Sequence, residues 1–441
     1  MSVDIQPSVR SEQAALPRTR DGAVDLARAW CLTLVVVLHA LMVGVWIGAQ
    51  GPVLQNALEG WAGFAPFTWL VQIMPLFFVL GGFSAFTQWT ALRDRGTTAS
   101  EYIATRMRRL LRPAVAAIGA MVVVLAVLSI LHVPADIVAV AGFRLSQPLW
   151  FLGVYALTTS LVPLMASAHR RVPIASVCAL ALAVVAVDIV RASTGVAAVG
   201  YLNLGFVWLL VQQLGFWLAD GRMPRSRVRL RMLAVGSFGA LALLCTTGAY
   251  SFDLLADLNP PCGVLVLLGV GQLALFDLAR PALRRMHAAR VVNGISTWIN
   301  ARAMTIYLWH MLVLVLLAGA LLLTGDALPI PLDGAWWTTR PIWLACVIAA
   351  VALVTRAVAR WEVKQTPALN AERSTGPLAA SMSTVLATGG VVILLATGIT
   401  VVGGVVGLAC IAAALVVVTR PPDASGTPVP RLSPAAASAA E

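Results

Sequence analysis

Charge is scarce in this chain of 441 residues, and lysine is almost absent. Only 11% of the residues are Asp, Glu, Lys or Arg, whereas 59% are hydrophobic. A soluble globule of this size needs more charged side chains to cover its surface. Lys364 is the single lysine, and the arginines lie between apolar runs rather than on one solvated face, which argues against nucleic-acid binding. The composition predicts a polytopic protein of the lipid bilayer.

Several catalytic and metal-binding patterns are also missing. The chain has no CxxC pair, HExxH helix, Walker loop or GxSxG turn, so no zinc site, disulfide framework, nucleotide loop or hydrolase nucleophile is indicated. Carboxylates are scarce within the apolar runs, Asp188 being the main exception, and this scarcity counts against an ion-coupled transporter. Small core residues are expected at the cysteines, which are Cys31, Cys178, Cys245, Cys262, Cys346 and Cys410.

Ten apolar runs are each long enough to cross a bilayer, which takes about 20 helical residues. They lie near 28–48, 66–90, 113–131, 148–166, 173–190, 201–219, 232–249, 262–279, 303–324 and 341–358. A further run over 383–419 is too long for one helix, and Gly403 and Gly404 predict a hairpin of two shorter spans or a re-entrant pair. The expected fold class is all-α: a polytopic transmembrane helical bundle of ten core spans plus a C-terminal two-span hairpin.

The distribution of positive charge predicts the orientation, because cytoplasmic loops retain Lys and Arg. With the N-terminus inside, every Lys and Arg except Arg144, Arg191 and Arg340 falls on the cytoplasmic side. We therefore expect an uncleaved first helix and a multi-pass protein of the inner (plasma) membrane with both ends cytoplasmic. The ends, 1–20 and 420–441, are expected to be disordered, and a cytoplasmic linker over 361–382 joins the 21–360 core to the 383–419 hairpin.

The first span carries an unusual set of ionisable residues in DLARAWCLTLVVVLHALM. Arg28 and His39 are eleven residues apart, which places them roughly 20° apart around a helix axis and roughly 16 Å apart along it. Asp25 shares the same stripe. His39 is thus about half-way through the hydrocarbon, where an ionisable group normally faces a bundle interior or a wet cavity. The imidazole is either functional or a neutral group that hydrogen-bonds neighbouring helices.

An arginine cluster precedes the third span in YIATRMRRLLRPAV. Four guanidinium groups lie within seven residues at a predicted helix start: Arg106, Arg108, Arg109 and Arg112. Bidentate guanidinium groups suit phosphates, although the topology signal alone also places arginines at this face. The cluster is therefore either a phosphate site or a determinant of orientation.

Three further segments carry polar or small residues into the spans. In ARAMTIYLWHMLVL, Tyr307 and His310 are i,i+3 neighbours, and His310 either meets the cavity of His39 or is its structural partner. In MPLFFVLGGFSAF, Pro75 and the Gly81-Gly82 pair are expected to bend or thin the second span. In QPLWFLGVYALTT, the expected interpretation is an aromatic belt at the outer face, formed by Gln147, Trp150 and Tyr155.

In this order, the segments resemble the integral membrane acyltransferase family 3, which includes O-antigen and peptidoglycan-type O-acetyltransferases. The resemblance covers about residues 20 to 360 and rests on VDLARAWCLTLVVVLHAL, PLFFVLGGF, YIATRMRRLLRP, QPLWFLGVY and YLWH. It implies a bacterial cell-envelope enzyme that moves an acyl group, usually acetyl, from cytoplasmic acyl-coenzyme A to a hydroxyl of a carbohydrate or another acceptor. No metal is implied.

The resemblance also implies roles for individual residues. His39 matches the proposed catalytic histidine of the family and Arg28 the arginine eleven residues before it, with Asp25 toward the same mouth. The Arg-x-Arg element, expected to hold the coenzyme A phosphates, falls on Arg106 and Arg108, with Arg109 as the alternative register. Many relatives have Ser-Gly where this chain has Gly81-Gly82. If that serine binds substrate in the relatives, either Ser84 or no residue replaces it here. Tyr307 and His310 are the other residues expected to bind the substrate.

Acyl transfer to a hydroxyl needs a base. Imidazole can act as this base with the smallest change in its pKa, because that pKa lies near neutral pH. His39 is either that base or a transient acyl carrier. The rival functions are a transporter or flippase of a small polar or lipid-linked substrate and a non-catalytic scaffold.

Overall fold

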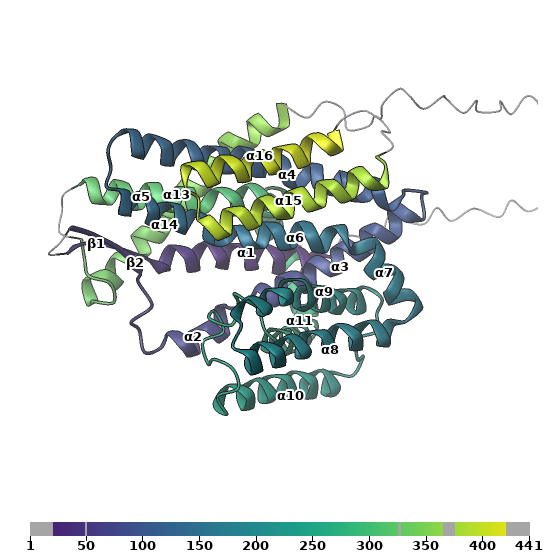
Figure 1. Ribbon diagram of the computed structural model, residues 1–441. Coiled ribbons are helices and arrows are strands. Elements are labelled where there is room, and N and C mark those ends of the chain that lie inside the picture. Colours follow the sequence, from purple (N-terminus) through teal and green to yellow (C-terminus); the bar gives the residue numbers. More distant parts are fainter. Residues whose placement is uncertain (1–20, 49–50, 325–327, 365–374, 420–441) are drawn as a thin grey trace, which may run out of the picture.

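The computed structural model describes residues 21–48, 51–324, 328–364 and 375–419 (Figure 1). Twelve helical segments in these ranges are long and apolar enough to cross a membrane, and they fall on the apolar runs of the sequence. The chain is therefore a multi-pass membrane protein with a predominantly helical fold. The two ends expected to be disordered, 1–20 and 420–441, lie outside the described residues.

The spanning segments pack side by side into one bundle (Figure 1). In chain order the helices are α1 (Gly22–Met42), α2 (Phe64–Val71), α3 (Met74–Arg93), α4 (Ala99–Ile130), α5 (Ala135–Ser146), the 3-10 turn η1 (Gln147–Leu149), α6 (Trp150–Ser160), α7 (Val162–Arg171), α8 (Pro173–Thr194), η2 (Ala197–Leu202), α9 (Asn203–Ala219), α10 (Arg227–Thr246), α11 (Val264–Ala288), α12 (Arg290–Ala301), α13 (Ala303–Leu323), α14 (Gly334–Lys364), α15 (Pro377–Thr397) and α16 (Val401–Thr419). Helices α2 and α3 form one span, as do α5 and α6.

A β-hairpin is the main departure from the expected all-α fold. The first span ends at Met42, and the chain continues as β1 (Val43–Gly48), which pairs antiparallel with β2 (Gly51–Asn56). The segment VGVWIG is apolar, so it extends the hydrophobic run of the helix, but its alternating β-branched residues favour a strand. Apolar length alone therefore predicted the end of this span wrongly.

The C-terminal hairpin is present, but its turn is not at Gly403 and Gly404. The turn follows α15 at Gly398, which has a positive φ of 64°, a conformation that glycine adopts readily. Gly404 lies in α16, where a Cβ would be 2.6 Å from Val122 of α4, so it permits close helix packing instead. Because α14 reaches Lys364 and α15 begins at Pro377, both ends of the expected 361–382 linker are helical.

The expectation of a core position holds for only part of the cysteines. Cys31, Cys245 and Cys262 are buried, whereas Cys178 and Cys346 are exposed. The exposed pair lies on α8 and α14, which bury few of their residues inside the bundle. An apolar sequence does not separate lipid-facing from core positions, because both environments are apolar.

Glycines allow α3 and α9 to approach closely. A Cβ on Gly215 would lie 2.0 Å from the Val79 carbonyl oxygen, and one on Gly82 would lie 2.2 Å from the Gln212 carbonyl oxygen. Small residues at such crossings let helix backbones pack together in membranes. Gly82 therefore sets the position of α3, which forms part of the functional cavity described below.

We expect Gly215→Ala to destabilise the protein by roughly 1–3 kcal/mol, because the new methyl group forces two backbones apart. Gly205→Ala on the same helix is the matched control, since a Cβ there meets nothing within 4 Å. Thermal unfolding in detergent micelles should show a lower midpoint temperature than wild type for Gly215→Ala and an unchanged midpoint temperature for Gly205→Ala. Equal midpoints for the two variants would show that the α3–α9 contact is not tight.

Candidate active site

Helix α1 is anchored at its first residues by an acidic N-cap. The Asp21 carboxylate accepts a hydrogen bond from the Ala23 amide at 3.0 Å and ion pairs from Arg280 at 2.6 Å and Arg284 at 2.7 Å. Burial alone would raise the pKa of Asp21, but the hydrogen bonds from Arg284 and Arg280 outweigh it and hold the pKa below its ordinary value. These contacts fix α1 against α11 and so set the height of the residues that follow.

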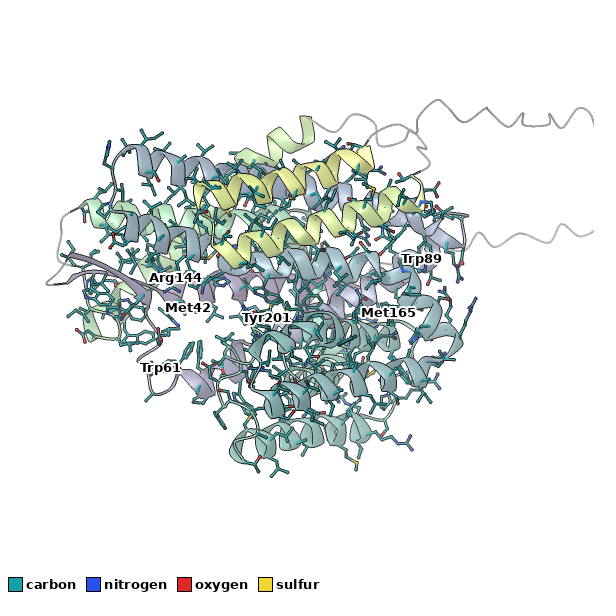
Figure 2. The ribbon with its side chains drawn as sticks, in the orientation of Figure 1. Met42, Trp61, Trp89, Arg144, Met165 and Tyr201 are labelled. Carbon is teal, nitrogen blue, oxygen red and sulfur yellow. The ribbon has the colours of Figure 1, made fainter. Side chains whose placement is uncertain are left out.

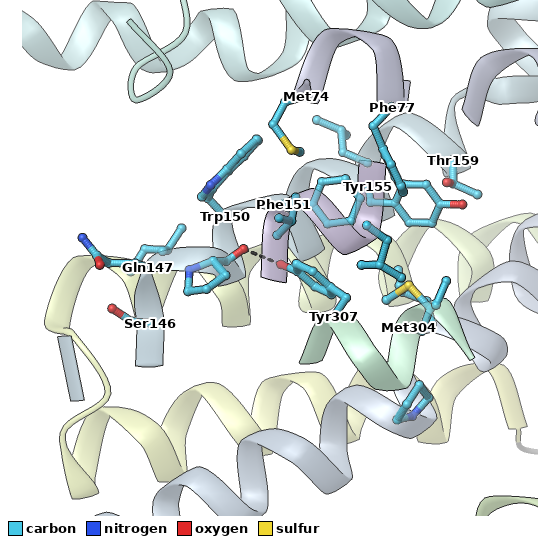
Figure 3. A pocket seen from close by; sticks show the side chains of 18 of the residues that line it. Met74, Phe77, Ser146, Gln147, Trp150, Phe151, Tyr155, Thr159, Met304 and Tyr307 are labelled. Carbon is cyan, nitrogen blue, oxygen red and sulfur yellow. Dashed lines mark hydrogen bonds between the residues drawn. The ribbon is translucent and has the colours of Figure 1, made fainter. Parts of the chain in front are cut away.

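A cavity of about 1820 Å³ lies within the bundle and is lined in part by α1. Figure 3 shows some of the side chains that line it. Its lining on α1 extends from Arg28 to Met42, roughly 21 Å along the axis at helical rise. Met42 and Tyr201, both labelled in Figure 2, belong to the lining at the end away from Arg28. The cavity therefore extends along α1 over roughly two thirds of the hydrocarbon thickness of a bilayer, which is about 30 Å.

Five arginines line this cavity, and none of its lining residues is Asp or Glu. They come from three separate parts of the chain: α1, α4 and the residue between α12 and α13. We call the part of the cavity that they line the arginine end, and its residues are Arg28, Arg106, Arg109, Arg112 and Arg302. Within the described ranges, no ion pair joins any of them to a carboxylate. The arginine end is thus an uncompensated cationic site.

Three of these guanidinium groups retain unused donors. The Nε atoms of Arg28, Arg106 and Arg302 are buried without a hydrogen-bond partner among the described residues, although buried donors are normally satisfied. Arg106 also donates to the Gln88 side chain, and Arg302 lies 5.1 Å from the Trp298 ring centroid. Unpaired donors on several arginines in one cavity are suited to an anion with several oxygens.

His39 and His310 meet beside the cavity, roughly 16 Å along α1 from Arg28. The Nε2 atom of His310 lies 3.1 Å from Nδ1 of His39, and Nδ1 of His310 lies 2.6 Å from the Tyr307 carbonyl oxygen. His310 is fully buried, whereas His39 is half-buried and lines the cavity. The two rings are therefore joined in one hydrogen-bonded series, and of the two only His39 borders the cavity.

The direction of this series follows from its last acceptor. A carbonyl oxygen only accepts, so Nδ1 of His310 carries the proton, and Nε2 of the neutral ring is an acceptor. Nδ1 of His39 must then donate to it, which leaves the lone pair of His39 on Nε2. His39 is thus held in the tautomer that acts as a base through Nε2.

Aromatic residues complete this part of the cavity (Figure 3). Tyr307 donates its hydroxyl proton to the Pro148 carbonyl in η1 and packs edge-on against Phe151, with ring centroids 4.9 Å apart. The Tyr155 ring stacks on the Phe151 ring, with ring centroids 5.4 Å apart. Since the Tyr307 hydroxyl is already bonded, Tyr307 positions α13 against η1 as well as lining the cavity.

The structure separates the predicted site residues into two groups. Arg28, His39, Arg106, Arg109 and Tyr307 line the cavity, and His310 contacts it through His39. Asp25 and Arg108 are not among the lining residues. The buried Asp25 offers its backbone carbonyl to Asn300, and Arg108 donates to the Val418 carbonyl of α16 at 2.8 Å.

Ser84 faces a small side cavity of about 90 Å³ that also touches Arg28 and Arg106. Its hydroxyl donates to the Leu80 carbonyl at 2.9 Å and is 3.5 Å from the Arg28 guanidinium. A Cβ on Gly81 meets nothing within 4 Å, so this position has room for a serine side chain. Ser84 therefore contacts Arg28 from the side cavity and does not line the main cavity.

The aromatic-belt interpretation of QPLWFLGVY was wrong. Span four begins at Ala135 rather than near 148, so η1 interrupts the span within the bundle, and Gln147, Trp150 and Tyr155 line the cavity. Residues 135–146 were missed because ADIVAVAGFRLS contains an Asp and an Arg and is only moderately apolar. Arg302 was also missed, although it stands five residues before Tyr307 in the same motif.

The fold and the cavity define a multi-pass membrane protein with a hydrogen-bonded histidine pair beside the cavity and an arginine end. The model of acyltransferase family 3, described as an acyltransferase domain, matches residues 21–357. The chain belongs to this family and is a membrane acyltransferase. No curated protein and no solved structure matches the chain.

We expect Asp21→Asn to lower stability at neutral pH by roughly 1 kcal/mol, because asparagine keeps the N-cap but loses two ion pairs. The pKa of Asp21 is lowered in the folded protein, so the stabilisation is complete above the ordinary carboxyl value of about 3.9 and declines as the pH falls below it. Thermal unfolding of the wild type and of Asp21→Asn from pH 7 to pH 3 measures how the stability difference between them changes with pH. A difference that grows in acid would contradict the assignment.

Proposed function

We propose that this membrane acyltransferase transfers an acyl group, acetyl in the simplest case, from acyl-coenzyme A to a hydroxyl of a carbohydrate or another cell-envelope acceptor. One observation supports the proposal: arginines without a carboxylate partner line the same cavity as a histidine whose Nε2 carries a lone pair. The arginine end is proposed to face the cytoplasm of a bacterial cell, in agreement with the charge distribution of the sequence.

Coenzyme A fits the arginine end by charge and by length. Its pyrophosphate and ribose phosphate are anionic, and Arg106, Arg109 and Arg302 offer donors with no competing carboxylate in the lining. From Arg28 to His39 the cavity follows α1 for roughly 16 Å, which suits an extended pantetheine arm. The thioester then lies near the middle of the membrane, at the histidine pair.

The transfer itself needs one base and no metal in the proposed scheme. Nε2 of His39 takes the proton of the acceptor hydroxyl while its oxygen attacks the thioester carbonyl. A new carbon–oxygen bond forms and the carbon–sulfur bond breaks. The imidazolium then returns the proton to the coenzyme A thiolate, so His39 ends the cycle neutral.

His310 acts in this scheme as a positioning residue. Its Nε2 accepts from Nδ1 of His39 in both charge states of His39, so it holds the ring orientation before and after proton transfer. A carboxylate in this place would charge the interior of the bilayer, which is expensive. A neutral imidazole orients the base without that charge.

We expect His39→Ala to abolish transfer, a loss of about 10²–10⁴-fold or more for a general base, while the protein stays folded. We expect His310→Phe, which keeps a ring but loses the acceptor, to lower kcat and leave the KM for acyl-coenzyme A unchanged. Turnover of labelled acyl-coenzyme A in liposomes measures both. Full turnover by His39→Ala would reject His39 as the catalyst.

Substitution of two neighbouring arginines separates a role in binding acyl-coenzyme A from a role in topology. Arg106→Gln should weaken acyl-coenzyme A binding by roughly 10- to 100-fold, the value of one lost charge-assisted hydrogen bond, and the difference should shrink at high salt. Arg108→Gln is the matched control, because Arg108 does not line the cavity and bonds to Val418. Calorimetry at low salt gives both dissociation constants. An equal effect of the two substitutions would assign both arginines to topology.

A further inference from the structure

The small side cavity beside the arginine end has polar walls that the proposed function does not use. Its volume is about 90 Å³, and residues of α1, α3, α4, α6 and α9 line it. Five residues line both this side cavity and the main cavity: Arg28, Phe77, Arg106, Tyr155 and Thr159. Figure 3 labels Phe77, Tyr155 and Thr159. At these five positions, no more than one side chain separates the two cavities.

Three residues of the side cavity carry a buried polar atom without a hydrogen-bond partner among the described residues. Two of these atoms are donors, Nε of Arg28 and Nε of Arg106, and the third is an acceptor, Oε1 of Gln212. The Gln212 residue is only 4% exposed. Because buried polar atoms are normally paired, the side cavity needs a ligand that supplies partners to both kinds of atom.

The orientation of the Gln212 amide follows from its other contact. Its Nε2 lies 3.3 Å from the Thr158 carbonyl oxygen, and a carbonyl oxygen only accepts, so Oε1 is the end of the amide that still needs a partner. The close approach of α3 and α9 at Gly82 holds the backbone of Gln212. Helix α9 therefore places a fixed acceptor at the side cavity.

Water is the ligand that fits both the atoms and the volume. An anion accepts from the two guanidinium groups, but it has no proton to donate to Oε1 of Gln212. A water molecule accepts from a guanidinium and donates to an amide oxygen, and buried waters typically bridge such atoms. A cavity of about 90 Å³ has room for about three waters, at roughly 30 Å³ each.

Arg28 depends on such a contact more than Arg106 does. Arg106 donates to the Gln88 side chain and lies 5.4 Å from the Tyr102 ring centroid. Arg28 makes a long hydrogen bond of 3.5 Å to the Ser84 hydroxyl. An arginine that is held loosely loses more side-chain entropy when a ligand orders it, so a further contact to Arg28 strengthens binding at the arginine end.

We propose that two or three waters in the side cavity link Arg28 to Gln212, and that Gln212 is thereby a positioning residue for the acyl donor. The waters accept from Nε of Arg28 and donate to Oε1 of Gln212, which holds the guanidinium in one orientation. The inference rests on the proposed function, in which the arginine end binds the phosphates of acyl-coenzyme A. Gln212 does not line the main cavity, so it acts on the donor only through the arginine.

A double-mutant cycle tests this link. Gln212→Leu keeps the approximate size of the side chain but removes the acceptor, and Arg28→Met keeps an apolar stem but removes the guanidinium. The matched control is Gln213→Leu, because Gln213 is fully buried, donates to the Met165 carbonyl at 3.4 Å and lines neither cavity. Calorimetry with acetyl-coenzyme A at low salt gives the dissociation constant of each single and double variant.

We expect Gln212→Leu to raise the dissociation constant by roughly 3- to 10-fold where Arg28 is present, the value of one hydrogen bond, and by less than about 2-fold in Arg28→Met. Gln213→Leu should leave the constant unchanged in both backgrounds. The same factor for Gln212→Leu in both backgrounds, or no effect in either, would overturn the link. Failure of the wild type to bind acetyl-coenzyme A would overturn the proposed function as well.

Filling the side cavity tests the waters without altering Gln212. Gly81 lines the side cavity, and a Cβ there meets nothing within 4 Å, so Gly81→Leu displaces water. Gly236→Leu on α10 is the control, since a Cβ there also meets nothing within 4 Å and Gly236 lines neither cavity. We expect Gly81→Leu to weaken acetyl-coenzyme A binding by the same roughly 3- to 10-fold and Gly236→Leu to leave it unchanged. Wild-type binding by Gly81→Leu would show that Arg28 does not depend on these waters and would overturn the proposal.

Discussion

The hydrogen bond between the two histidines organises the interior of this protein. An imidazole at mid-membrane needs a partner for each nitrogen that does not face water. His310 supplies that partner, and the Tyr307 carbonyl fixes the proton on the far side of His310. Because each hydrogen bond in this series has a fixed donor and a fixed acceptor, the Tyr307 carbonyl of α13 determines that Nε2 is the unprotonated nitrogen of His39.

Charge is arranged around this pair with a clear asymmetry. Carboxylates such as Asp21 and Asp277 neutralise Arg280 at the start of α1, whereas the arginines that line the cavity have no carboxylate partner in the part of the chain that the structure describes. The Nε atoms of Arg28, Arg106 and Arg302 are buried without a hydrogen-bond partner among the described residues, and a bound anion would satisfy these donors. In the proposed function, the coenzyme A part of the donor is this anion, and the base lies roughly 16 Å further along α1.

The sequence predicted apolar helices long enough to cross a membrane and the position of His39 roughly 16 Å from Arg28 on the first of them, because both follow from hydrophobic length and helical rise. It did not distinguish Arg106 from Arg108, which are two residues and thus roughly 200° apart on α4, because their facing depends on where α16 packs. It extended span one through VGVWIG, since apolar length does not separate a strand from a helix. The lining by Gln147 and Thr388 was also beyond sequence reasoning, because η1 and α15 reach the cavity only through tertiary packing.

The most direct test of the account is the protonation state of the two rings, measured by ¹⁵N NMR on protein labelled only at histidine. His39→Gln and His310→Gln assign the signals. The account predicts that at neutral pH both rings are neutral with the proton on Nδ1, and that the His39 Nε2 signal shifts when acyl-coenzyme A binds. A His39 ring protonated on Nε2 and unprotonated on Nδ1 would contradict it.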